Sequence, residues 1–145
     1  MLNKKIHIYC SNSYEVLRKE YPMVKSNLLD YDSENNQPRA TKEISEKFME
    51  LLNMDSEILD VYTISDIPLN ITGTLIDMGV FDCANVKVTF VGYNDSNLEL
   101  IHVESSFTNK GYMEINWPFG CMTCWSEFYC PGYNKLVKKY LKNEK

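Results

Sequence analysis

Three cysteines near the carboxyl terminus have a spacing that is typical of metal or redox chemistry. Cys121 and Cys124 form a Cys-x-x-Cys pair, and Cys130 follows. Two thiolates at this spacing can bind one zinc ion, and a structural zinc site takes four ligands from cysteine or histidine. The fourth ligand would have to come from elsewhere in the chain, where the candidates are His7, Cys10, Cys83 and His102. Zinc is therefore the one cofactor that the sequence suggests.

The same cysteines also fit two other interpretations. A Cys-x-x-Cys pair between a strand and a helix can act as a redox dithiol, because that position lowers the pKa of the first thiol. Alternatively, the cysteines only pack, which is the interpretation that we favour, since free cysteine behaves as a small hydrophobic residue. The total of five cysteines is odd, which argues against a complete disulfide framework.

The histidines are the candidate general bases, and the chain has two of them, His7 and His102. Cys10 follows His7 by three residues, but on a strand these side chains point to opposite faces, so we predict no Cys–His pair. The sequence fingerprints of phosphate-binding loops, serine hydrolases and zinc proteases are absent. The sequence thus names no catalytic residue. It leaves enzymatic activity open and favours a protein that binds.

Negative charge is concentrated in the middle of the chain. The net charge is −5, and residues 30–104 contain fifteen acidic and four basic side chains, whereas the flanking segments are basic. Such a charge distribution attracts basic partners and disfavours nucleic acid. The ordinary role of an acidic stretch is a solvated surface, and the alternative is a docking surface. The candidate partner-binding residues are six acidic residues and two aromatic anchors: Asp55, Glu57, Asp60, Asp66, Asp77, Asp82, Trp125 and Tyr129.

These observations lead to a hypothesis about function. We expect a non-catalytic inhibitor or immunity-type protein that occludes a basic protein partner, such as a toxin or a nucleic-acid-handling enzyme. One alternative is a zinc-binding or thiol-redox protein built on the carboxyl-terminal cysteines. Another is a small-molecule-binding protein with a tyrosine-lined pocket between sheet and helices.

The first half of the chain has signals for both helices and strands. Residues 5–10 alternate apolar and polar side chains, as in a half-buried strand, and residues 11–13 can cap a helix over 14–21. Residues from Thr41 onward carry an apolar stripe at helical spacing: Ile44, Phe48, Leu51 and Leu52. Residues 58–64 and 70–76 are rich in branched side chains, so we predict short strands there.

The second half predicts a meander followed by a helix. Residues 85–93, 98–107 and 112–117 alternate in polarity and are separated by turns, and a last helix follows Pro131 and Gly132. With 145 residues and 44% hydrophobic content, the sequence predicts one α+β domain over residues 1–145. We expect a mostly antiparallel sheet with two to four helices packed on it. No apolar run is long enough for a membrane span, so we expect a soluble, cytoplasmic protein.

Overall fold

The computed structural model describes residues 3–22, 27–32, 35–93, 99–115 and 118. The described chain is α+β, as expected. Its elements, in chain order, are β1 (Lys5–Cys10), α1 (Tyr14–Glu20), β2 (Tyr31–Asp32), β3 (Gln37–Pro38), α2 (Thr41–Leu52), β4 (Ile58–Thr63), α3 (Ile67–Asp77), the 3-10 helix η2 (Cys83–Asn85), β5 (Val86–Tyr93) and β6 (Leu100–Ser106). The predicted carboxyl-terminal helix lies outside the described residues.

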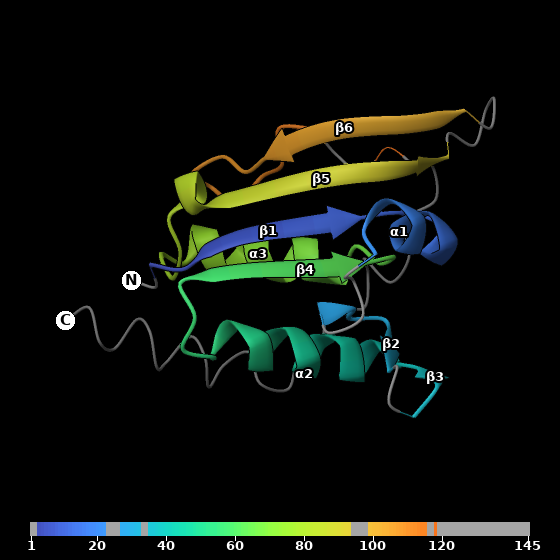
Figure 1. Cartoon of the computed structure of the whole chain (residues 1–145). Helices are drawn as coiled ribbons and strands as arrows, with labels where there is room; N and C mark the ends of the chain where they lie inside the picture. The colour runs from blue at the N-terminus through green and yellow to red at the C-terminus, as the bar shows by residue number, and fades with distance from the viewer. Residues whose placement is uncertain (1–2, 23–26, 33–34, 94–98, 116–117, 119–145) are drawn as a thin grey trace.

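The main sheet is mixed rather than mostly antiparallel. Its strand order is β4-β1-β5-β6, and a separate antiparallel pair joins β2 and β3. β1 lies in the middle and pairs in parallel with both β4 and β5 (Figure 1). The predicted sheet type was wrong because helices connect β1, β4 and β5, and a helical crossover returns the chain to start the next strand in the same direction.

The predicted meander is only partly present. β5 and β6 form the expected antiparallel hairpin, with Lys87 opposite Ser106 at one end and Tyr93 opposite Leu100 at the other. The third strand is not confirmed. In its described part, an isolated bridge joins Phe107 to Met113, and the amide of Glu114 donates to the carbonyl of Ser106.

One face of the sheet is covered by α2 and α3, and we call it the closed face (Figure 1). α2 has its apolar stripe where the sequence predicts it, and its buried side chains join those of α3 and the inward-facing strand residues in one core. The largest fully buried side chains of this core include Phe48, Phe90, Ile8, Leu52, Ile71 and Leu75. The burial of these apolar side chains is the main source of stability in the described fold.

The segment predicted as a strand over residues 70–76 belongs instead to α3. Pro68 lies in the first turn of that helix, where proline is well tolerated because the first turn has no helical acceptor for its missing N–H. α3 is buried almost all round, so it lacks the polar face that would have revealed a helical period. Gly73 is needed for packing: a Cβ atom there would lie 2.4 Å from the carbonyl oxygen of Gly111.

The opposite face of the sheet is only half covered, and we call it the open face. α1 packs over the carboxyl-terminal half of the parallel strands, where Val16 and Leu17 are buried with Val91. Five partly buried tyrosines surround these residues: Tyr9, Tyr14, Tyr21, Tyr31 and Tyr62. The amino-terminal half of this face carries polar side chains instead. No helix in the described ranges is long and apolar enough to cross a membrane.

Candidate functional site

His7 stands in the middle of the open face, because β1 is the central parallel strand and alternate residues of β1 face the core. Its Nε2 atom lies 2.6 Å from the hydroxyl oxygen of Thr89, and its ring stacks on Tyr9 with 4.0 Å between ring centroids. Burial lowers the pKa of His7, Lys87 lowers it further, and the carboxylates of Asp60 and Glu104 oppose this shift. The imidazole is therefore neutral at pH 7 and is held by one hydrogen bond and one ring contact.

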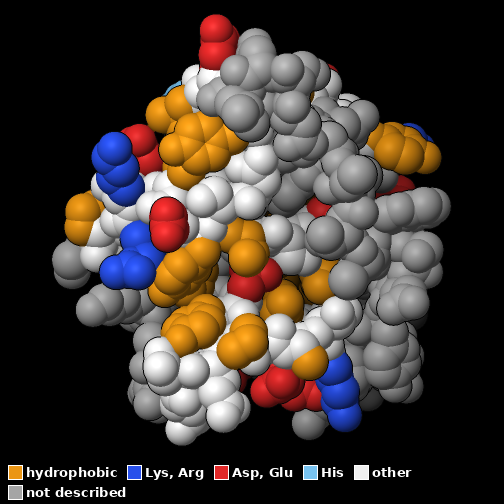
Figure 2. Space-filling model, turned by 90° about the vertical axis from the view of Figure 1, so that its right-hand side faces the viewer, with side chains coloured by type: hydrophobic (Ala, Val, Ile, Leu, Met, Phe, Trp, Pro, Cys, Tyr) orange, Lys and Arg blue, Asp and Glu red, His pale blue; other side chains and the backbone are white. Residues whose placement is uncertain are grey.

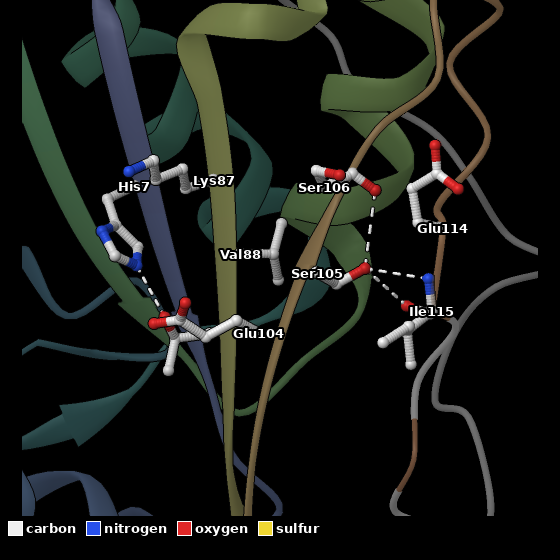
Figure 3. Close-up of a pocket in the computed structure, with 9 residues that line it drawn as sticks. His7, Lys87, Val88, Glu104, Ser105, Ser106, Glu114 and Ile115 are labelled. Carbon is white, nitrogen blue, oxygen red and sulfur yellow. Dashed lines mark hydrogen bonds between the residues drawn. The ribbon is translucent and has the colours of Figure 1, made fainter.

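Two cavities lined by described residues adjoin His7 on the open face. The first has a volume of about 290 Å³ and lies over β5 and β6 (Figure 3). The hydroxyl of Ser105 is 2.9 Å from both the amide nitrogen and the carbonyl oxygen of Ile115, which fixes the outer wall. Figure 3 shows Glu104 reaching toward His7, whereas Glu114 points away from it. This cavity is lined by His7, Lys87, Val88, Thr89, Glu104, Ser105, Ser106, Glu114 and Ile115.

The second cavity lies on the other side of His7, toward the amino ends of the strands. It has a volume of about 280 Å³ and shares His7 and Lys87 with the first. Its other lining residues are Lys5, Ile6, Ile58, Asp60, Ala84 and Asn85. Both acidic and basic groups line this cavity, and Asp60 is the predicted partner-binding residue that it contains.

Four of the predicted acidic residues lie at the end of the sheet where the parallel strands begin. Asp55 and Glu57 precede β4, Asp77 ends α3, and Asp82 precedes η2; all four are exposed. In Figure 1 this end is on the left, where α2 and α3 terminate and β1, β4 and β5 start. Two segments that are distant in sequence, residues 55–57 and 77–82, thus place carboxylates at one end of the described structure.

Asp66 is not at this end. It is the N-cap residue of α3, at the end of the sheet where the parallel strands finish, and its exposed fraction is 0%. A fully buried carboxylate cannot contact a partner protein, so Asp66 does not belong to a docking surface. The predicted anchors Trp125 and Tyr129, and the cysteines Cys121, Cys124 and Cys130, lie outside the described residues.

A buried lysine holds the loop that carries Asp55. The ammonium of Lys4 donates to the carbonyl of Met54 at 2.6 Å and to the hydroxyl of Ser56 at 3.1 Å. Burial lowers the pKa of Lys4, and the charge of Asp55 opposes that shift. Lys4 therefore offsets part of the charge of Asp55.

Two methionines are exposed at this end, Met54 by 54% and Met78 by 38%. We define the amino-end surface as Met54, Asp55, Glu57, Asp77, Met78 and Asp82.

The surface at the carboxyl ends of the parallel strands differs in its side chains from the surface at the amino ends. Figure 2 views the molecule from that side, where hydrophobic side chains gather in the middle of the described surface. Ligands of open α/β sheets often bind there, in the crevice where the strand order reverses. Asn12 bridges that point between β1 and β5: its amide nitrogen is 2.7 Å from the carbonyl oxygen of Tyr93, and its oxygen accepts from the amide of Tyr93 at 3.1 Å.

Cys10 and Asp30 are buried near this end. Burial and the nearby charges of Asp30 and Asp66 raise the pKa of the Cys10 thiol well above its usual value, so the thiol stays protonated and unreactive. Burial raises the pKa of Asp30 to about 6, although its hydrogen bonds and Arg39 act in the opposite direction. The Asp30 carboxylate accepts from the amide of Ile64 at 2.8 Å.

The candidate zinc ligands within the described ranges do not form a metal site. Cys10 ends β1 and Cys83 begins η2, at opposite ends of the sheet, and both are free thiols. His7 belongs to β1 and His102 to the edge strand β6. Among the described residues, no group of three or more His, Cys, Asp and Glu side chains could hold a metal ion.

Several residues of the open face could have been found in the sequence but were not singled out. Lys87, Thr89 and Glu104 occupy the outward positions of strands that the alternation correctly predicts. The sequence does not show which strands are neighbours in the sheet. In the structure β1 pairs with β5, so His7 lies beside Lys87. No protein-family model, curated protein or solved structure matches this chain.

Proposed function

We propose that this protein is a non-catalytic inhibitor or immunity-type protein that occludes a basic protein partner through the amino-end surface. The observation that supports the proposal is that distant segments bring exposed carboxylates to one end of the fold beside two exposed methionines. Met54 lies next to Asp55, and Met78 lies next to Asp77.

The composition of this surface suits protein binding. Protein interfaces combine an apolar centre with a polar rim, and methionine is enriched in them because its flexible thioether adapts to a partner. Carboxylates at the rim accelerate the encounter with a basic protein. Because Lys4 offsets part of the charge of Asp55, the steering is expected to come mainly from Glu57, Asp77 and Asp82.

The surroundings of His7 support binding over catalysis. The hydroxyl that pairs with its imidazole belongs to Thr89, whose exposed fraction is only 2%, so it offers a substrate little access. Cys10 is buried on the opposite face of the sheet and is kept protonated. Neither Thr89 nor Cys10 therefore gives His7 an accessible nucleophile to activate.

The zinc or thiol-redox alternative remains a prediction that rests on Cys121, Cys124 and Cys130. Elemental analysis of the full chain tests it directly. Stoichiometric zinc that is lost on Cys121→Ser would favour a zinc protein. The absence of metal, together with the absence of a reducible disulfide, would contradict both forms of the alternative.

The docking proposal is tested by reversing charge at one end of the molecule. A partner captured from the native host would be purified, and its binding kinetics measured with the wild type, with Glu57→Lys/Asp82→Lys and with the control Glu15→Lys/Glu20→Lys. The control changes the net charge equally at exposed positions of α1. We expect association with the amino-end variant to be slower by about tenfold or more and to depend less on salt, because rim charges act mainly on the association rate.

Two results would contradict this function. In the first, both double variants bind with the same kinetics, which would mean that only the net charge matters. In the second, the captured protein is acidic, so that charge reversal strengthens the complex. Circular dichroism of each variant checks that the fold is retained.

A further inference from the structure

A row of three charged or titratable side chains crosses the open face beside the second cavity. In the register of the sheet, His7 lies directly between Asp60 on β4 and Lys87 on β5. All three line the same cavity of about 280 Å³, and Lys5, also on β1, lies at its edge. An acidic and a basic side chain thus flank one pocket, with an imidazole between them.

Asp60 and Lys87 do not form an ion pair with each other within the described residues. Neighbouring strands are separated by about 4.8 Å, so the backbones of Asp60 and Lys87, two strands apart, are separated by about 10 Å. Among the described residues, the ion pairs within 4.0 Å join side chains of α2, and none involves Asp60, Lys5 or Lys87. The pocket therefore offers an acceptor, Asp60, from β4 and a donor, Lys87, from β5 on the other side of β1.

We propose that this pocket binds a small zwitterion whose two charges are several bonds apart, as in a dipeptide or an ω-amino acid. The ligand carboxylate lies at the ammonium group of Lys87, and the ligand ammonium lies at the carboxylate of Asp60. Lys5 lines the pocket from the central strand β1. This site goes beyond the proposed protein docking, because the amino-end surface includes none of these three residues.

The remaining lining residues agree with such a ligand. Ile58 and Ala84 provide apolar contacts for the methylene groups between the charges, and Asn85 adds an amide that can donate or accept. A singly charged ligand would leave one side of the pocket unpaired, and each charge-assisted contact contributes more than a neutral hydrogen bond. A ligand with both charges is therefore preferred over one that carries either alone.

The first cavity is less well suited to this ligand. Its charged lining residues are Lys87, Glu104 and Glu114, and Figure 3 shows Glu114 directed away from His7. The two cavities share Lys87 and His7, so a ligand in the second cavity contacts the residues that separate them. His7 is therefore the natural reporter of occupancy.

The experiment uses the ring protons of the two histidines in a proton NMR titration of the full chain. His102 is exposed on β6 and lines neither cavity, so it is an internal reference. The probe is 4-aminobutyrate, and the matched singly charged probes are butyrate and butylamine. Glycine, whose charges are one carbon apart, tests the spacing.

We expect 4-aminobutyrate to shift the His7 signals saturably, while His102 stays unchanged. Asp60→Asn and Lys87→Gln should each raise the dissociation constant by about tenfold, which corresponds to one lost charged contact. The control variants Glu15→Gln and Lys110→Gln make the same changes of charge at exposed sites outside the pocket and should bind as the wild type does.

The proposal is overturned if His7 does not respond, or if butyrate, butylamine or glycine binds as tightly as 4-aminobutyrate. It would also be overturned if Asp60→Asn and Lys87→Gln bound 4-aminobutyrate as tightly as the wild type does. The dispersion of the amide signals shows whether each variant is folded. None of these measurements involves the protein partner, so failure here is distinguishable from failure of the docking proposal.

Discussion

The two faces of the central sheet are built for different purposes. On the closed face, successive strands contribute apolar side chains that are completely buried under α2 and α3. On the open face, α1 covers only one half, and the other half carries His7, Asp60 and Lys87 beside two cavities. Stability and the proposed ligand recognition thus fall on separate faces: the closed face supplies the folding energy, and the open face keeps its polar side chains.

Neighbouring residues of β5 allow a direct test of this separation, because Phe90 faces the closed side and Thr89 faces the open side. Phe90→Ala should destabilise the protein by about 3–5 kcal/mol, since it removes a buried ring and leaves a cavity. Thr89→Val removes the hydroxyl that pairs with His7 and should cost about 1 kcal/mol. Urea unfolding of the variants measures both. Equal losses would show that the two faces do not differ in this way.

The packing of the closed face can be broken without removing any atom. Gly73→Ala adds a Cβ atom 2.4 Å from the carbonyl oxygen of Gly111, so helix α3 or the turn at Gly111 must move. Alanine favours a helix by about 1 kcal/mol over glycine, but we expect the overlap to dominate and to give a net loss of about 1–3 kcal/mol. Thermal unfolding measures it, with Thr74→Ala as control. A stabilised Gly73→Ala variant would mean that the turn yields freely.

The pH dependence of the free energy of unfolding tests the effect of burial on Asp30, which lies near the carboxyl ends of the parallel strands. Burial raises its pKa from 3.8 to about 6. The folded state then holds this proton more tightly than the unfolded state. Protonation of Asp30 therefore contributes to the free energy of unfolding. That contribution is fully present below pH 3.8 and is lost as the pH rises through about 6. Asp30→Asn keeps an oxygen that can accept from the amide of Ile64.

Relative to the wild type, Asp30→Asn should therefore gain about 1–2 kcal/mol of stability between pH 4 and pH 7. Urea unfolding at a series of pH values gives this difference. Asp77→Asn, at an exposed carboxylate, controls for the change in net charge. A stability difference that is constant with pH would show that Asp30 titrates normally.

Strands and helices with clear periodicity could be predicted from the sequence, whereas their pairing could not. β1, α2 and the β5–β6 hairpin lie where alternation or a helical stripe indicates them, and β4 lies where branched side chains do. α3 was missed because its branched side chains favour a strand locally, and burial on nearly all sides removes the polar face of a helix. That error carried over to the sheet, since without α3 there is no helical crossover to make β5 parallel to β4, and therefore to β1.

The candidate site was predictable only in its individual residues. The sequence identified the acidic segments, but it could not show that Asp66 caps a buried helix while Asp82 stays exposed. His7 was identified as an imidazole, and Asp60 as a carboxylate, without any indication that they are neighbours. Such relations depend on the strand order, which local patterns do not encode.

The central position of β1 also constrains how the chain acquires its structure. Ile6 pairs with Leu59 on one side and with Val86 on the other, so the strand nearest the amino terminus has no neighbour until much of the chain is available. Contacts between such distant residues require the closure of long loops, which slows folding. We therefore expect the locally paired β5–β6 hairpin to precede β1 in folding, with β1 inserting late between two strands that are already formed.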